Sequence, residues 1–325
     1  MSVLEASLSI GTNLWQDDAH SVNDYVGVVT NVAKSTCAPV LIDTAEVYTN
    51  GASERAVGLV RARAEAEGVQ CLIMTKHLPL PWHLNARAAV FAALRKSLER
   101  LQMPAIDLYY VHVANLSLRP LHVYADVFAE AVHSGLIKAV GISNFSEAQM
   151  QDFHKQLASH GIPLLAHQLE LSLLRCSPLK SGLVEACQEL GVKPVAWCAL
   201  GGGRGRLTSA TLAGSRGDRE LDAVLQECNA VATTRGVTIE EVAIAWVIGH
   251  GAIPVVGTRK QTHAATAANA AKLLLSATEM ERLDEVAMED NGLYTSLMAR
   301  NAATRFVATN ILKPLLQDPS HRSSL

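Results

Sequence analysis

Four side chains suited to moving a proton follow three successive apolar runs of the sequence. Asp43 and Tyr48 lie in "LIDTAEVYTNGASE", Lys76 follows "CLIMT", and His112 follows "IDLYY". A tyrosine has an ordinary pKa of roughly 10, which is too high for an ideal proton donor at neutral pH. A nearby ammonium is expected to lower that pKa, and a carboxylate would hold the ammonium in place. The set is therefore suited to carbonyl reduction.

Each residue has a role in that chemistry. Asp43 is expected to anchor Lys76, and Lys76 to tune Tyr48, which supplies the proton. His112 is expected to orient or polarise the substrate carbonyl. No side chain carries a hydride, so a nicotinamide cofactor is implied. Taken singly, the four residues have structural explanations as a cap, a packed ring, a rim charge and an interior histidine; at three successive strand ends, chemistry is favoured.

The elements that must position these residues alternate along the chain. Short apolar, β-branched runs predict eight strands, and amphipathic stretches between them predict helices. The predicted strands are 8–11, 39–45, 71–77, 106–113, 137–143, 164–172, 193–200 and 252–258; the helices include 53–67, 85–101, 123–135, 146–161, 178–191 and 218–236. This pattern predicts an α/β fold, a closed (β/α)₈ TIM barrel, in which functional groups gather at the carboxyl ends of the strands. An open Rossmann sheet is disfavoured because no G-x-G-x-x-G follows the first strand.

The chain is expected to form one domain over residues 1–325, because no break in composition divides it. The barrel core is placed at about 5–290, with an extra helix, "TIEEVAIAWVIGHG", before the eighth strand. A C-terminal extension, 291–325, carries apolar residues at helical spacing. This tail helix is expected either to cover its own barrel or to dock on a protein partner.

Composition narrows the classes of partner and place. A net charge of −3 and a pI near 6.5 give no basic field for nucleic acid. No apolar run approaches membrane-spanning length, no histidine or cysteine pattern predicts a metal, and the six cysteines are scattered. A cytoplasmic protein without a membrane partner is expected. The alternative is a peroxisome-like organelle, because the final Ser-Ser-Leu resembles the S-K-L address.

The sequence also resembles the aldo-keto reductase superfamily over nearly its whole length. The stretches that carry the resemblance are "DTAEVYTNGASE" (commonly D-T-A-x-x-Y-G-x-S-E), "MTKH", "LYYVHV", "GLIKAVGISNFS", "HQLELSLL", "AWCALGGG" and "VVGTRK". The resemblance implies that Asp43, Tyr48, Lys76 and His112 form the catalytic tetrad. It also implies that Ser143, Asn144 and Gln168 bind the nicotinamide carboxamide and that Trp197 stacks on its ring.

Two segments depart from the family pattern on the cofactor side. The loop after "WCALGGG" is short, and Gly201 with Arg204 and Arg206 would meet the pyrophosphate there, unless the segment is only a solvated glycine turn. Relatives usually carry a Glu-Asn pair for adenine where this chain has Thr266 and Ala267. His263 and Asn269 are alternative contacts.

The basic pair of the last motif bears on the choice of cofactor. Gly257, Thr258, Arg259 and Lys260 are expected to bind the cofactor. Arg259 and Lys260 are expected to meet a 2′-phosphate, which favours NADP(H) over NAD(H), unless the pair is only surface charge. Trp15 and Trp82 are expected either to wall an apolar pocket for the substrate or to serve only in loop packing.

Two functions of different classes follow from these patterns. The first is NADPH-dependent reduction of an aldehyde or ketone to an alcohol, with the proton from Tyr48. The alternative is a cofactor-binding scaffold or redox-sensing subunit with little turnover, which the altered cofactor segments and the unassigned tail favour.

Overall fold

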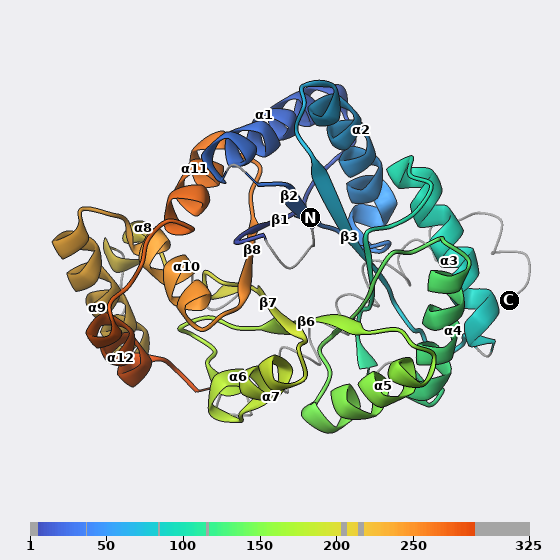
Figure 1. Cartoon of the computed structure of the whole chain (residues 1–325). Helices are drawn as coiled ribbons and strands as arrows, with labels where there is room; N and C mark the ends of the chain where they lie inside the picture. Colours follow the sequence, from blue (N-terminus) through green and yellow to red (C-terminus); the bar gives the residue numbers. More distant parts are fainter. Residues whose placement is uncertain are drawn as a thin grey trace, which may run out of the picture. The chain divides into compact units, whose positions relative to one another are not determined.

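Eight parallel strands close into a barrel in which each strand pairs with the next and β8 pairs with β1 (Figure 1). The strands are β1 Ser9–Gly11, β2 Val40–Asp43, β3 Cys71–His77, β4 Leu108–Val111, β5 Val140–Ser143, β6 Leu164–Glu170, β7 Lys193–Trp197 and β8 Ile253–Gly257. Each lies within its predicted run, so the predicted (β/α)₈ barrel is confirmed. The structure is a computed structural model that describes residues 6–36, 38–83, 85–114, 117–202, 207–213 and 218–289.

Helices surround the strands and connect their carboxyl ends to the next strand (Figure 1). They are α1 Ala19–Thr36, the short turn η2 Tyr48–Gly51, α2 Ala52–Ala66, α3 Ala86–Leu101, α4 Leu121–His133, α5 Glu147–Ser159, α6 Ser177–Lys180, α7 Leu183–Glu189, α8 Ser209–Ala213, α9 Arg219–Arg235, α10 Ile239–Gly249, α11 Gln261–Ala270 and α12 Ala277–Val286. The predicted extra helix before the eighth strand is α10. Its first turn is a capping box between Thr238 and Glu241, which satisfies backbone N–H groups that the helix leaves unpaired.

The inside of the barrel is filled by strand side chains. One buried cluster includes Leu41, Leu72, Met74, Leu108, Tyr110, Ala166, Val195, Ile253 and Val255. The Tyr110 ring packs against Gly141 of β5, where an added Cβ would be 2.5 Å from the nearest ring carbon. Because the interior is close-packed, the strand ends that carry the site have a rigid base.

The chain divides by its contacts into a unit of Met1–Met288, which contains the barrel, and a second unit of Glu289–Leu325. The predicted C-terminal extension, with its tail helix and its Ser-Ser-Leu end, lies outside the described residues, and the single-domain organisation stays a prediction.

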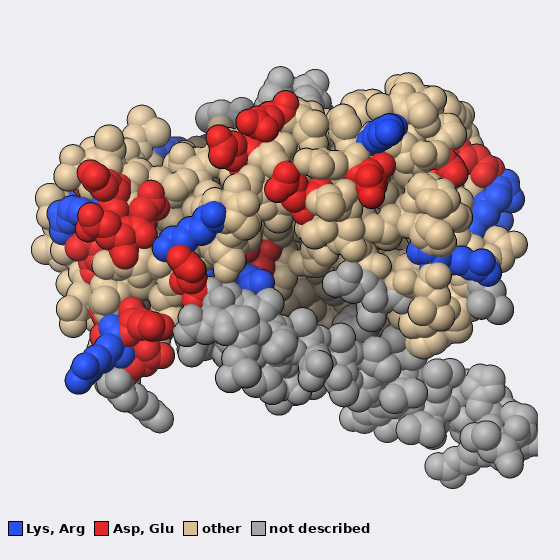
Figure 2. All heavy atoms as spheres, turned by 90° about the horizontal axis from the view of Figure 1, so that it is seen from below, with Lys and Arg blue, Asp and Glu red and all other residues tan. Residues whose placement is uncertain are grey.

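Neither a membrane span nor a metal cluster is found in the part of the chain that the structure describes. No helix there has both the length and the apolar character to cross a membrane, and no group of three or more His, Cys, Asp or Glu is arranged to hold a metal ion. Among the described residues that are visible in Figure 2, basic and acidic side chains are interspersed.

Candidate active site

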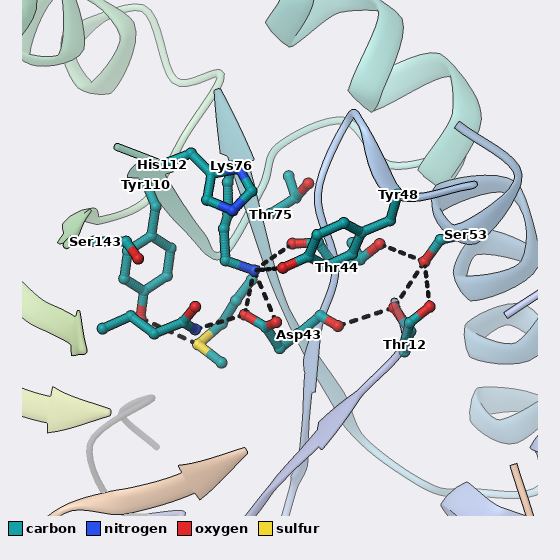
Figure 3. A network of polar contacts seen from close by, with 12 residues as sticks. Thr12, Asp43, Thr44, Tyr48, Ser53, Thr75, Lys76, Tyr110, His112 and Ser143 are labelled. Atoms are coloured by element: carbon teal, nitrogen blue, oxygen red, sulfur yellow. Dashed lines mark hydrogen bonds and ion pairs between the residues drawn. The ribbon is translucent and has the colours of Figure 1, made fainter. Parts of the chain in front are cut away.

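Asp43, Lys76 and Tyr48 meet at the carboxyl ends of β2 and β3 (Figure 3). The Lys76 ammonium Nζ lies 2.7 Å from both carboxylate oxygens of Asp43 and 3.3 Å from the Tyr48 hydroxyl. Lys76 is completely buried and Asp43 nearly so, whereas Tyr48 is half-buried. A buried ion pair needs its remaining hydrogen bonds satisfied, and both partners have them.

The partners of this ion pair come from two further elements. Lys76 Nζ also donates to the carbonyl of Thr44 at 2.7 Å, and the Gln168 amide on β6 donates to Asp43 Oδ1 at 2.7 Å. A carboxylate, a carbonyl and a phenol therefore surround the ammonium. The ammonium is a fixed donor that points at the Tyr48 oxygen.

The protonation states follow from burial and from these charges. Burial raises the pKa of Tyr48; Lys76 lowers it, but the net pKa is above the ordinary value. Burial lowers the pKa of Lys76, yet Asp43 and Tyr48 raise it further, so the ammonium stays charged. The expected net lowering of the Tyr48 pKa is therefore wrong in this structure, because desolvation outweighs the ammonium. Tyr48 is a protonated phenol at neutral pH.

His112 stands beside Tyr48, just past the end of β4. The two rings meet edge to face, with centroids 5.8 Å apart and an interplanar angle of 76°. Burial, followed by Lys76 and His77, holds the pKa of His112 well below its usual range. The imidazole is therefore neutral at pH 7, and its Nδ1 makes no hydrogen bond with the described residues. A neutral imidazole has one N–H donor to offer a carbonyl oxygen.

The turn that carries Tyr48 has an unusual backbone. Thr49 and Asn50, which follow Tyr48 in η2, have φ of 46° and 54°. Positive φ is a marked outlier for a β-branched residue such as Thr49. The quoted family motif has Gly directly after its Tyr, whereas this chain inserts these two residues before Gly51.

Hydroxyl groups fix this turn to the first two strands (Figure 3). Ser53 Oγ donates to the carbonyl of Thr12 at 2.8 Å and lies 2.8 Å from the hydroxyls of both Thr12 and Thr44. Thr12 Oγ1 in turn donates to the carbonyl of Asp43 at 2.9 Å.

A cavity of about 410 Å³ opens above these residues. Its wall includes Asp43, Tyr48 and His112, and also Gly257 of the predicted phosphate segment. The wall also contains the four residues predicted to bind nicotinamide, which are Ser143, Asn144, Gln168 and Trp197. A second cavity, of about 560 Å³, lies between α2 and α3, is lined mainly by charged residues and shares no lining residue with the first.

Asn144 organises one wall of the mouth cavity. Its side-chain oxygen accepts from Trp197 Nε1 at 3.1 Å, and its Nδ2 donates to the His112 carbonyl at 3.2 Å and to Ser143 Oγ at 3.0 Å. The amide is thus used within the protein, where it holds the half-buried Trp197 ring. A direct Asn144 contact with nicotinamide stays a prediction.

The predicted phosphate segment is a tight loop between β8 and α11. Arg259 and Lys260 are exposed, and neither forms an ion pair with another described residue. Gly201 lies next to the cavity residue Gly202, whereas Arg204 and Arg206 lie outside the described residues. In α11, Ala267 is buried, Thr266 donates to the Thr262 carbonyl at 3.2 Å, and Asn269 and His263 are exposed.

The two tryptophans expected at the substrate pocket do not line the cavity. The Trp15 indole is completely buried, stacked on Tyr25 with centroids 4.2 Å apart, and its Nε1 donates to the Thr258 carbonyl at 2.8 Å. The expectation that Trp15 lines the pocket wall is wrong, because its ring packs in the core. Trp82 is 55% exposed, on the loop after β3, and its substrate role stays a prediction.

A buried ion pair missed by the sequence analysis supports the site from behind. The Glu54 side chain is completely buried; it accepts from Thr75 Oγ1 at 2.7 Å and from Arg100 Nη1 at 2.9 Å. Thr75 precedes Lys76 on β3, and Glu54 belongs to the motif "DTAEVYTNGASE". In that motif Glu54 directly follows a serine of the network above. The signal in the sequence was therefore an acid within a matched motif that had no role assigned to it.

Glu46, in the loop after β2, has a structural task. Its Oε1 accepts from the backbone N–H of Leu78 at 2.6 Å and lies 3.2 Å from Nδ1 of the buried His77. The loop after β2 is thereby fastened to the end of β3.

Comparison with known proteins gives a consistent family. A family model described as the aldo/keto reductase family matches residues 7–288. A chloroplastic pyridoxal reductase of Arabidopsis thaliana is 30% identical over 269 residues, which are 77% of this chain and 73% of the relative. A 6-dehydroglucose reductase of Novosphingobium aromaticivorans is 32% identical over 243 residues, 71% of this chain and 76% of the relative.

Solved structures show the same fold. A crystal structure of an aldo/keto reductase from Klebsiella pneumoniae, in complex with NADP and acetate, superposes with a TM-score of 0.71. It is 24% identical, and the match covers 88% of this chain and 92% of the other.

Proposed function

The chain belongs to the aldo/keto reductase family, and from that premise we propose that it reduces an aldehyde or ketone to an alcohol with NADPH. The observation that carries the proposal is the Lys76 ammonium, which is 2.7 Å from Asp43 and 3.3 Å from the Tyr48 hydroxyl in the cavity wall. Tyr48 donates the proton, and Lys76 stabilises the negative charge that develops on its oxygen.

The residues of the cavity fit a nicotinamide. Ser143 and Gln168 bring buried polar groups to the cavity wall, and Trp197 presents an aromatic ring there for stacking. When bound, NADPH would supply the hydride that no side chain carries. Asn144 would act through Trp197, which it holds in place.

His112 orients the substrate in this proposal. Its low pKa keeps the imidazole neutral, so it donates an N–H to the carbonyl oxygen without carrying a competing charge. The proton that completes the alcohol then comes from Tyr48, whose raised pKa keeps the phenol protonated at neutral pH.

NADPH is proposed rather than NADH because of the segment after β8. Arg259 and Lys260 are exposed, free of ion pairs within the described chain, and stand at the N-terminus of α11. The helix N-terminus and two cations together suit the 2′-phosphate. The NADP in the Klebsiella pneumoniae complex is in keeping with this choice.

The first test is cofactor binding. NADPH and NADH are titrated separately while tryptophan fluorescence is followed, with Trp197→Leu as the control. The proposal expects saturable quenching that is stronger for NADPH and reduced in the control. Absence of quenching, with calorimetry in agreement, would show that no cofactor binds.

A carbonyl panel then separates the reductase from its alternative. Pyridoxal and 6-dehydroglucose belong in the panel, since the names of two relatives indicate them. Tight cofactor binding with no turnover would favour a cofactor-binding scaffold instead. Two observations favour this alternative: the Thr266 hydroxyl bonds within α11, and Ala267 is buried. These positions therefore offer no side-chain amide to bind adenine.

A cytoplasmic location is part of the proposal. Burial raises the pKa of Cys71 and Cys228 to about 12, and the described cysteines form no disulfide. Such inert, reduced thiols are typical of a reducing compartment.

A further inference from the structure

Trp15 connects two segments that serve different parts of the proposed reaction. It follows β1, and its indole is fully buried against Tyr25 of α1, with an interplanar angle of 11°. A stacked, buried indole has a fixed orientation, so its N–H has a fixed direction. That N–H donates to the Thr258 carbonyl at 2.8 Å, across 243 positions of sequence.

The segment held by the indole is the proposed phosphate loop. Thr258 Oγ1 accepts from the Lys260 N–H at 3.1 Å and donates to the Lys260 carbonyl at 3.0 Å. Arg259 therefore lies within a closed loop whose first residue is fixed by Trp15. Shifting the Thr258 carbonyl would shift both cations relative to α11.

The backbone of Trp15 holds the catalytic turn. Its carbonyl accepts from Thr49 Oγ1 at 3.0 Å, and the same oxygen of Thr49 accepts from the Ser53 N–H at 2.9 Å. Thr49 is the first of the two inserted residues at positive φ, immediately after Tyr48. A backbone conformation of this kind persists only where its surroundings determine it, and the Trp15 carbonyl is one of those surroundings.

We propose that Trp15 is a positioning residue that couples occupancy of the Thr258–Lys260 loop to the orientation of Tyr48. The inference rests on the proposed function, in which Arg259 and Lys260 receive the 2′-phosphate. Binding there fixes the position of the Thr258 carbonyl, and through it the Trp15 indole. The backbone carbonyl of Trp15, which accepts from Thr49, is fixed as a result. By reciprocity, loosening the Tyr48 turn weakens NADPH binding. NADH, which lacks the 2′-phosphate, makes little use of the connection.

The test compares two fully buried tryptophans, each of which donates its indole N–H to an oxygen of the protein. Trp15→Phe keeps an aromatic ring next to Tyr25 but removes the N–H donor together with part of the indole volume, and the control below loses the same volume. Trp246→Phe is the control, because Trp246 is also fully buried and donates its Nε1 to Asp284 at 2.7 Å, away from the site. We expect Trp15→Phe to raise the Kd for NADPH about tenfold, as loss of a partner for a buried carbonyl does, and the Kd for NADH less than about threefold. Trp246→Phe lowers Tm and leaves the ratio of the two Kd values unchanged.

A purely structural role gives a different result. If Trp15→Phe weakens NADPH and NADH equally, or changes neither, the coupling is absent. Kinetics adds a second readout, since kcat at saturating NADPH should fall in Trp15→Phe and stay unchanged in Trp246→Phe. Failure of wild-type protein to bind either cofactor would instead refute the proposed function.

Hydrogen exchange on the cofactor-free protein decides the coupling independently of that outcome. Trp15→Phe should speed amide exchange in both Thr49–Ser53 and Thr258–Gln261, relative to Trp246→Phe. Thr49→Val, which removes the hydroxyl at the other end of the connection, should also speed exchange at Thr258–Gln261, whereas Thr49→Ser should not. The proposal would be overturned if Thr49→Val sped exchange only in Thr49–Ser53, or if Trp15→Phe sped exchange in neither Thr49–Ser53 nor Thr258–Gln261.

Discussion

At the scale of single residues, a substitution that removes the Tyr48 hydroxyl can distinguish proton donation from cofactor binding. Tyr48→Phe removes the proton donor and leaves the ring in the cavity wall. We expect kcat to fall about 10²- to 10⁴-fold, the usual contribution of a general acid, with little change in the Kd for NADPH. Steady-state kinetics and a fluorescence titration measure the two quantities.

Tyr109→Phe is the matched control for this prediction. Tyr109 is fully buried, and its hydroxyl has no hydrogen-bond partner among the described residues. Its removal should leave kcat unchanged. An equal loss of kcat in both variants would show that Tyr48→Phe acts through the packing of the ring and not through the proton.

The residues of the site were predictable from sequence to different degrees. Asp43, Tyr48, Lys76 and His112 follow strands that the apolar pattern identifies, and the barrel brings these strand ends together. The burial of Trp15 was not predictable, because its partner Thr258 is 243 positions away and the first strand's exit alone suggests an open loop. The net direction of the Tyr48 pKa was wrong, since the extent of desolvation depends on the cavity wall as a whole.

At the scale of elements, the Glu54–Arg100 pair joins α2 and α3 behind β3. Arg100→Met removes the partner of a carboxylate that is completely buried, and an unpaired buried charge is expensive. We expect a loss of about 3 to 5 kcal/mol in the free energy of unfolding, measured by denaturant titration.

Arg87→Met is the control for the Arg100 variant. Arg87 joins α3 to Glu130 on α4, but its side chain is 64% exposed. Its loss should leave the denaturation midpoint close to that of wild type, because water screens an exposed pair. Comparable shifts in both variants would contradict the supporting role of Glu54.

The helices show where local sequence is a weak guide. The predicted helix 178–191 is two helices, α6 and α7, because Gly182 between them adopts a φ of 79°. Helix α1 had no predicted range: its segment is rich in valine, a poor helix former. Val22, Val28, Val29 and Val32 are nevertheless buried, and α1 packs along α11 and α2. Tertiary packing therefore stabilises this helix, and the local sequence pattern does not reveal that packing.

At the scale of the whole molecule, two buried neutral histidines should make the fold sensitive to acid. Burial lowers the pKa of His167 from 6.5 to about 3, and that of His112 lies well below 6.5. The unfolded chain binds these protons below about pH 6.5 while the folded chain does not, so stability falls as pH falls from 6.5 towards 3. At about 1.4 kcal/mol per pKa unit, His167 alone accounts for a loss on the order of 4 kcal/mol.

Thermal unfolding across this pH range measures the effect. His167→Gln should flatten the fall of Tm with pH, because it removes one titrating group. His20→Gln is the control, since the His20 side chain is 90% exposed. If His167→Gln and wild type lose Tm in parallel below pH 6.5, other groups dominate the acid response.

The barrel itself was predictable because its information is repetitive. Eight apolar runs recur at similar intervals, and parallel strands buried on both faces give a strong signal even when each is short. "CLIMTKH" became β3 over its full length, and the other strands begin or end within a few residues of the predicted runs. How the loops at the strand ends contact one another depends on closure, so the connection through Trp15 became visible only in three dimensions.

The most direct test of the account follows the hydride and the proton in one reaction. Purified protein is mixed with the carbonyl panel and with NADPH deuterated at the transferring position, and the alcohols are analysed by mass spectrometry. We expect an alcohol that carries one deuterium on the former carbonyl carbon, formed by wild type and Tyr109→Phe and nearly lost in Tyr48→Phe. An alcohol without deuterium, or no alcohol from substrates that a known reductase consumes, would contradict it.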